Sequence, residues 1–340
     1  MTLPDASTVE KHAIVRQAGG FLPTPQAGLI EVRGRDRLEW LHNLVTNTVR
    51  NLGTGDGNYA FATNAQGRVL FDLNLLVLDE AAWLDIDRRW IDAAYTHLDK
   101  YHVTEDVALE NVSNSWVRYG VLGPATARVV ESLGLGANFA ALADIQSVGG
   151  KANGIDIRLF KDRVGPISLA NFIVPASESN RFAELLASQA ETASMTSIDQ
   201  ALFDMIRIEA GRPASVDDID DQVIPPETLQ IERGISYVKG CYIGQEVIER
   251  MRSRGVMARR LTGFSVQGDR MPPHNAPVFG NGKEIGRITS SCYSVSLNGI
   301  LGLGYLKTLL AESASTIEVA LDENTRAAIE PIDLPLPAWR

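Results

Sequence analysis

The segment from Lys239 to Glu246 carries the clearest chemical signal in the chain. It reads Lys239-Gly240-Cys241-Tyr242-Ile243-Gly244-Gln245-Glu246, and a helix is expected over residues 244–253 with Gly255 as its stop. Cys241 then lies just before a helix N-terminus, where free backbone N–H groups and the helix dipole favour a thiolate. Lys239 adds a nearby positive charge. A lone cysteine is otherwise a small core hydrophobe, but this setting favours a reactive thiol at Cys241.

Five arginines follow this segment within a short stretch of an otherwise acidic protein. They are Arg250, Arg252, Arg254, Arg259 and Arg260. A charge run is most often a solvated helix face. The same residues would also suit a polyanion of modest size, such as a polyglutamate tail, a phosphate group or an RNA backbone, and their position alone does not choose among these.

Acidic residues gather at positions 217–221, ahead of Pro225, Pro226 and Glu227. The aspartates lack the spacing, the glycine and the closing glutamate of an EF-hand calcium loop, so a solvated acidic loop is expected. Glu227 is better placed, because two prolines before it stiffen the backbone. A carboxylate there is a natural partner for the N–H and NH₂ edge of a pterin or guanine ring.

Metal-ion and nucleotide motifs are missing from the sequence. The five histidines show no ligand spacing, and the two cysteines, Cys241 and Cys292, cannot hold an iron–sulfur cluster by themselves. No stably bound metal is therefore expected from this chain alone. Cys292 falls in an expected strand and is interpreted as a buried structural thiol.

The elements that must position these residues change in character along the chain. The first third mixes helices at 36–49 and 89–101 with strands at 59–63, 69–78 and 107–112, and residues 64–67 form a hairpin loop. The middle third adds strands at 155–160 and 167–174 and a clear helix at 196–209, in which Ser197 and Gln200 make a capping box. From about residue 257 short strands separated by turns predict a small β-barrel or sandwich.

Composition places limits on the class of protein. The chain has 340 residues, 45% hydrophobic and 22% charged, with a formal net charge of −10. These values exclude disorder, collagen and coiled coil, and the acidic balance disfavours whole-surface binding to nucleic acid or anionic membrane. We find neither a secretory signal nor an apolar run long enough to span a membrane, so the expected location is the cytoplasm.

The Lys239–Glu246 motif, with Arg250 four residues on, resembles the signature of the YgfZ family of folate-binding iron–sulfur cluster assembly and repair proteins. That family is related to the glycine-cleavage T-protein, an aminomethyltransferase. The resemblance extends over residues 25–335. Its further matches are residues 44–47, 64–73, 207–211, 286–291 and 302–305.

The resemblance implies an α+β fold in which two mixed α/β, ferredoxin-like lobes and a C-terminal β-barrel form a ring around a central folate pocket. It places the T-protein-like region at residues 1–256, with the two lobes meeting somewhere in 115–150, and the barrel at 257–340. The implied ligand is tetrahydrofolate or a polyglutamylated folate.

The resemblance also implies roles for particular residues. Glu227 would hold the pterin edge, and Arg250, with Arg252 or Arg254, would face the glutamyl end. Lys239 and Tyr242 complete the expected folate-binding set, and Cys241 would be the functional thiol. Asp72 falls where T-proteins carry an Asp-Asp pair that acts on the folate, and here the pair reads Phe71-Asp72.

Two functions are open at this point. The first is a tetrahydrofolate-binding accessory factor that assembles or repairs [4Fe–4S] clusters on client enzymes, among them tRNA-modifying radical enzymes, with scaffold proteins as further partners. The second is a tetrahydrofolate-dependent aminomethyl or methyl transferase. An intact Cys241 and a lost carboxylate favour the first. Direct RNA binding through the arginines is disfavoured by the net charge.

Overall fold

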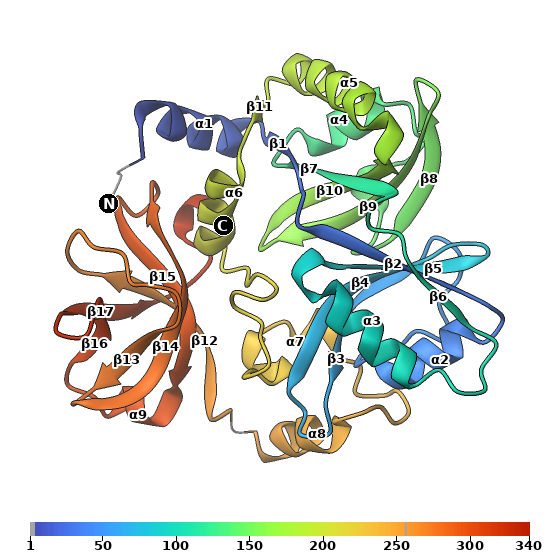
Figure 1. Cartoon of the computed structure of the whole chain (residues 1–340). Coiled ribbons are helices and arrows are strands. Elements are labelled where there is room, and N and C mark those ends of the chain that lie inside the picture. The colour runs from blue at the N-terminus through green and yellow to red at the C-terminus, as the bar shows by residue number, and fades with distance from the viewer. Residues whose placement is uncertain (1–3, 256) are drawn as a thin grey trace.

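The computed structural model describes residues 4–255 and 257–340, which fold into two open sheets and one closed barrel (Figure 1). The predicted class, two mixed α/β lobes followed by a C-terminal β-barrel, is confirmed. The barrel and the two sheets surround helix α6 and the segment that follows it.

The first lobe is a five-stranded sheet in the order β3-β4-β5-β2-β6. Its elements are β2 (Ala27–Arg33), α2 (Arg37–Leu44), β3 (Gly57–Thr63), β4 (Val69–Val77), β5 (Ala81–Asp87), α3 (Ile91–Lys100) and β6 (Ala108–Asn111). Strand β4 shows why the sheet has two different faces. Phe71, Leu73 and Leu75 pack into the core beneath α2 and α3, while Asp72 and Asn74 project from the other face, because side chains alternate along a strand.

The second lobe is a six-stranded sheet in the order β11-β1-β7-β10-β9-β8. Its elements are β1 (Gly20–Pro23), β7 (Trp116–Leu122), α4 (Thr126–Ser132), β8 (Ser147–Ala152), β9 (Ile155–Val164), β10 (Ile167–Pro175), α5 (Ser179–Thr192) and β11 (Thr196–Ser197). The alternation repeats here. Leu159 and Phe172 pack under α4 and α5, whereas Asp162 and Asn171 face the first lobe.

The barrel closes in the order β12-β15-β14-β13-β16-β17. Its elements are β12 (Arg259–Val266), β13 (Ala276–Gly280), β14 (Lys283–Ser294), β15 (Gly299–Lys307), α9 (Thr308–Glu312), β16 (Ile317–Ala320) and β17 (Arg326–Ile332). Of the two alternatives that the sequence left open, barrel or sandwich, the closed barrel is therefore the observed one.

The remaining elements connect these three units. They are α1 (Ala6–Gln17), α6 (Gln200–Glu209), α7 (Ile231–Gly234) and α8 (Gln245–Arg254), with a short 3₁₀ turn over Pro225–Thr228. Glu209, at the end of α6, joins several of them. It is fully buried and accepts hydrogen bonds from His12 of α1, from Ser294 and Ser296 of the barrel and from Trp339 near the C-terminus.

Two predicted helices are shorter than expected. The capping box at Ser197 and Gln200 is wrong: Asp199 is the N-cap of α6, its side chain accepts the Leu202 amide at 2.8 Å, and Thr196–Ser197 pairs with β1 as a strand instead. Helix α2 ends at Leu44 because the backbone of Val45 is extended and forms an antiparallel β-bridge with Ala62. In both places pairing with a distant strand outweighs local helix propensity.

Candidate functional site

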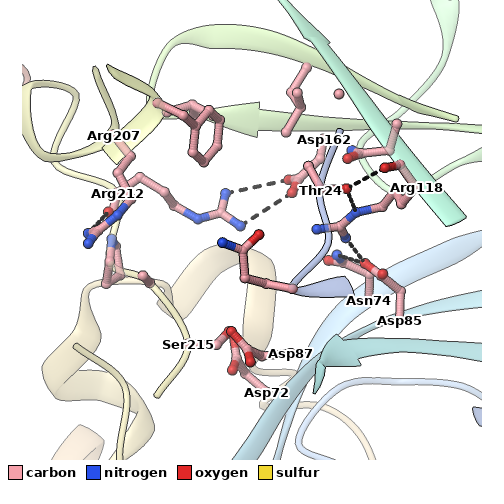
Figure 2. A pocket seen from close by; sticks show the side chains of 18 of the residues that line it. Thr24, Asp72, Asn74, Asp85, Asp87, Arg118, Asp162, Arg207, Arg212 and Ser215 are labelled. Carbon is pink, nitrogen blue, oxygen red and sulfur yellow. Dashed lines mark hydrogen bonds and ion pairs between the residues drawn. The ribbon is translucent and has the colours of Figure 1, made fainter. Parts of the chain in front are cut away.

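A cavity of about 460 Å³ lies where the two sheets meet α6 and the segment that follows it (Figure 2). Strands β3, β4 and β5 of the first lobe form one wall, and β7, β9 and β10 of the second lobe form another. Residues 212–215, directly after α6, form a third. Three parts of the fold thus build one concave site, which is the usual form of a small-molecule site.

The most distinctive pair in the cavity is Tyr59 and Asp72. The Tyr59 hydroxyl donates a hydrogen bond of 2.7 Å to Asp72 Oδ2, and both side chains are buried. Burial raises the pKa of both groups, and the neighbouring Ser215 and Tyr59 side chains partly offset the rise at Asp72. Asp72 Oδ1 has no hydrogen-bond partner among the described residues, although Ser215 lies beside it (Figure 2).

Asp162 of β9 lies in the cavity wall that the second lobe forms. Its carboxylate accepts hydrogen bonds from Arg212 at 3.3 and 3.4 Å and from Arg233 at 2.7 Å. Burial alone would raise the pKa of Asp162, but the two guanidinium groups outweigh it and hold the pKa well below its usual range. Arg233 also lies over the Tyr59 ring at 4.4 Å from its centre, so this charge pair packs directly against the Tyr59–Asp72 pair.

A third polar group runs along the lobe interface. Arg118 contacts Asp85, and Asp85 accepts a hydrogen bond of 2.9 Å from Asn74 Nδ2. Asn74 Oδ1 and Asn171 Nδ2 are buried and, like Asp72 Oδ1, have no partner among the described residues. The cavity therefore offers two acceptors and one donor that the rest of the described chain leaves unused, which is the arrangement expected of a polar ligand site.

Two protein-family models together match most of the chain. Residues 4–235 match the GCVT N-terminal domain, and residues 259–336 match the glycine cleavage T-protein C-terminal barrel domain. The chain belongs to the glycine cleavage T-protein family.

Individual relatives agree with this assignment. The aminomethyltransferase of Geobacillus kaustophilus (strain HTA426) is 27% identical over 347 residues, covering 98% of this chain and 91% of that protein. The aminomethyltransferase of Thermoanaerobacter sp. (strain X514) is 24% identical over 320 residues, covering 93% and 85%. The crystal structure of glycine cleavage system aminomethyltransferase T from Bartonella henselae superposes with a TM-score of 0.83 at 20% identity, covering 98% of this chain and 90% of that one, and so shares its fold.

In this T-protein fold the Lys239–Glu246 motif packs on the tip of the β3–β4 hairpin. Thr63 Oγ1 donates to the Ile243 carbonyl at 2.5 Å. Gly244 has a left-handed backbone with φ of 82°, and a side chain at that position would collide with Asn64. Figure 1 shows α8 at the edge of the molecule, next to the ends of β3 and β4. The motif is thus joined to the strands that carry Tyr59 and Asp72, but at their far end.

Lys239 is engaged with the backbone around α2. Its ammonium group donates to the carbonyl oxygens of His42, Val45 and Asn47 and lies 4.9 Å from the centre of the Tyr242 ring. Burial and the positive charge of Arg50 lower the pKa of Lys239 to about 7, and Glu39 partly offsets this shift. Tyr242 is buried and Cys241 is exposed. The geometry makes Lys239 an anchor for the loop that presents the Cys241 thiol.

The other predicted ligand residues also lie away from the cavity. Buried Glu227 accepts hydrogen bonds from the Ile224 amide at 3.0 Å and from Arg259 Nε at 2.9 Å. The exposed Arg250 pairs with Glu246 at 2.6 Å. Arg252 pairs with Glu249 at 3.7 Å, and the Arg254 side chain is outside the described part of the structure.

Of the residues predicted to act on or bind folate, Asp72 alone lines the cavity as far as the structure describes the chain. Sequence reasoning missed its neighbours Tyr59, Asn74, Asp162, Asn171 and Arg212. A signal for them existed, since a polar residue within an apolar strand is unusual, as at Asn74 in Val69–Val77. The prediction of a solvated loop is wrong for Asp218, which is fully buried.

Two further features of the described residues concern metal ions and membranes. Within residues 4–255 and 257–340, no group of three or more His, Cys, Asp or Glu side chains could hold a metal ion. In the same ranges no helix has the length and apolar character needed to cross a membrane. Cys292 lies in β14 as expected and is partly buried, and burial raises the pKa of its thiol.

Proposed function

We propose that the central cavity binds tetrahydrofolate and that the protein transfers a one-carbon unit to or from it. The observation that carries this proposal is the buried Tyr59–Asp72 pair, with Asp72 Oδ1 free of any partner among the described residues. A buried carboxyl group with a raised pKa inside a cleft is the usual setting of a general acid or base.

The cavity fits a reduced folate. Its volume of about 460 Å³ lies within the range of small-molecule sites. Asp72 and Asn74 would accept hydrogen bonds from the pterin N–H and NH₂ groups, and Asn171 would donate to the pterin carbonyl. When bound, tetrahydrofolate supplies the nitrogen atoms that carry a one-carbon unit.

The residues around the cavity have different roles in the proposed one-carbon transfer. Asp72 holds or accepts a proton at Oδ1, while Tyr59 fixes the carboxyl group by donating to Oδ2. Arg212 and Arg233, both tied to Asp162, keep positive charge beside the pair. Tyr59, Asp72 and Asp162 are buried, and the low local dielectric strengthens these interactions.

The position of Phe71 indicates that the carboxylate missing from the acidic pair is not one that would face the cavity, so its loss does not argue against one-carbon transfer. The sequence suggested that Phe71 replaces one carboxylate of an acidic pair in T-proteins. Phe71 is 1% exposed and packs with the His97 ring on the helix side of the sheet. Neighbouring residues of a strand face opposite sides, so Asp72 is the member of the pair that reaches the cavity, and it is present. The whole-length relatives named aminomethyltransferase support the same activity.

A second candidate is the accessory role in iron–sulfur cluster assembly or repair that the YgfZ resemblance suggested. The exposed Cys241 on a loop anchored by Lys239 favours it, since that thiol is available to a partner protein. Client enzymes or scaffold proteins would then supply the other cluster ligands, because two cysteines cannot complete the set. Either function would take place in the cytoplasm, where thiols stay reduced.

A pair of single variants separates the two candidates. Reconstitution with the other glycine cleavage proteins measures glycine-dependent formation of methylenetetrahydrofolate, and we expect activity that Asp72→Asn lowers at least a hundredfold, roughly the contribution of a positioned acid–base group. Cys241→Ala should leave that activity unchanged. If wild-type protein is inactive there while cluster-dependent enzymes in a deletion strain require Cys241, the accessory role replaces the transferase.

A further inference from the structure

Asp218 connects the barrel to the wall of the central cavity. Its carboxylate is fully buried. Oδ2 accepts hydrogen bonds from Arg207 at 2.7 Å and from the Ala214 amide at 2.9 Å. Oδ1 accepts from the Ser290 hydroxyl at 2.7 Å and from the Thr289 hydroxyl. One carboxylate thus receives donors from helix α6, from the segment after it and from strand β14.

An irregularity in β14 allows two neighbouring residues to reach the same carboxylate. In a regular strand Thr289 and Ser290 would face opposite sides of the sheet. The register of β14 against β15 shifts between Ile288 and Ser290, which marks a β-bulge. Bulges re-aim side chains, and here both hydroxyl groups point at Asp218 and both residues are buried.

The groups that Asp218 holds belong to the cavity wall. Arg207 and Ala214 both line the cavity, as do Arg212 and Ser215 on the same segment. The segment also folds back on itself, because the Asp218 amide donates to the Ala214 carbonyl at 2.9 Å. Arg207 in turn donates from Nη2 to Ser290 at 2.9 Å and so closes the network.

We infer that Asp218, held by Thr289 and Ser290, is a positioning residue for the central site. The barrel supplies none of the cavity-lining residues within the described chain, yet through this carboxylate it sets the orientation of residues 212–217. Those residues present Arg212 to Asp162 and Ser215 to Asp72. The barrel therefore tunes ligand affinity from outside the cavity. The identity of the ligand rests on the proposed function.

The test must separate positioning from simple support of the fold. Asp218→Asn removes the buried carboxylate that Arg207 contacts, leaving it only the less buried Asp204, and risks unfolding the protein, so the main variant is Ser290→Ala. Its matched control is Ser291→Ala, whose hydroxyl donates instead to the Pro272 carbonyl at 2.9 Å. Ser290→Thr keeps the hydroxyl and serves as the rescue variant.

Two readouts are taken on the folded full-length protein. Hydrogen–deuterium exchange reports the amides of residues 212–217, and calorimetry gives the Kd for tetrahydrofolate. Ser290→Ala should speed exchange and weaken binding, each by about tenfold, as expected when a hydrogen bond to a charged group is lost. Ser291→Ala and Ser290→Thr should stay close to wild type in both.

The outcomes are distinguishable. Unchanged exchange and unchanged Kd in folded Ser290→Ala would overturn the positioning role, as would equal effects in Ser291→Ala. If wild-type protein does not bind tetrahydrofolate, the proposed function fails, and exchange in residues 212–217 still decides the positioning role. Faster exchange in Ser290→Ala supports it, and unchanged exchange refutes it.

Discussion

Tyr59 of β3 lies diagonally across from Asp72 of β4, since Tyr59 pairs with Asn74 and Asp72 with Phe61, and the Tyr59 hydroxyl donates a hydrogen bond of 2.7 Å to Asp72 inside the cavity. The pairing leaves Asp72 Oδ1 as a buried acceptor without a partner among the described residues. Strands β3 and β4, which are joined by one hairpin, therefore place the Asp72 carboxyl group at the ligand site.

Tyr59→Phe tests this relationship through pH. The Tyr59 hydrogen bond stabilises the ionised Asp72, so its removal raises the pKa of that carboxyl further. Binding that needs the carboxylate is lost as pH falls through this pKa, and the loss should occur at higher pH in the variant. The measurement is the Kd for tetrahydrofolate across a pH series. Tyr95→Phe, on α3, is the control and should keep the wild-type profile, whereas an identical profile for Tyr59→Phe would contradict the account.

Glu209→Gln tests the junction of α1, α6, barrel and C-terminus. Burial opposes ionisation of Glu209, but the hydrogen bond from His12 and its other donors lower its pKa to about 2. The unfolded carboxyl titrates near 4.5, so the ionised group stabilises the native state above that pH by about 3 kcal/mol. This contribution is lost between about pH 4.5 and about pH 2.

Denaturant unfolding at several pH values measures that effect. At pH 6 to 7, well above the unfolded pKa, wild type should exceed Glu209→Gln by roughly this amount, and the gap should close on acidification. The exposed Glu184 of α5 provides the control variant, Glu184→Gln, which should be neutral. A gap that persists unchanged to pH 2 would show that the carboxylate charge is not responsible.

The two thiols should differ in reactivity. Cys241 is exposed, whereas Cys292 is partly buried and burial raises its pKa, which suppresses the thiolate. A chromogenic disulfide reagent should react rapidly with one thiol in the native protein and with the second only after unfolding. Cys241→Ala should abolish the rapid phase. A rapid phase that survives in that variant would assign the reactive thiol to Cys292.

Lys239→Met tests whether this lysine anchors a loop or binds folate. The variant removes three hydrogen bonds to carbonyl oxygens near α2 and should cost about 2 kcal/mol of stability. Lys151→Met, which removes an exposed pair with Asp156, should be nearly neutral. Because Lys239 does not line the cavity, the Kd for tetrahydrofolate should not change. A selective loss of binding in a stable variant would restore the folate role.

The sequence allowed the hairpin at 64–67 and the barrel strands to be predicted, because each has a local signature, whereas Asp72 was singled out only through the family resemblance. Turn residues bound the hairpin, and Gly280-Asn281-Gly282 marks a turn in the barrel. Local pattern also predicted α8 at nearly its observed bounds. Such features depend on residues close together in the chain.

The rest of the site depends on contacts between distant residues. Asp162 is recognisable only beside Arg212 and Arg233, which come from separate segments. The Lys239–Glu246 motif gave a strong signal, but no local pattern shows that it packs at the tip of the hairpin rather than inside the cavity. Asp218 looked like part of a solvated acidic run because three of its four donors, Arg207, Thr289 and Ser290, come from other elements of the fold.

The most direct test of the central claim is a crystal structure of the complex with tetrahydrofolate. We expect the pterin in the central cavity, with a ring nitrogen within hydrogen-bond distance of Asp72 Oδ1 and with Asn74 or Asn171 in contact. A folate bound instead along α8, against Arg250 or Cys241, with the central cavity filled only by water, would contradict it.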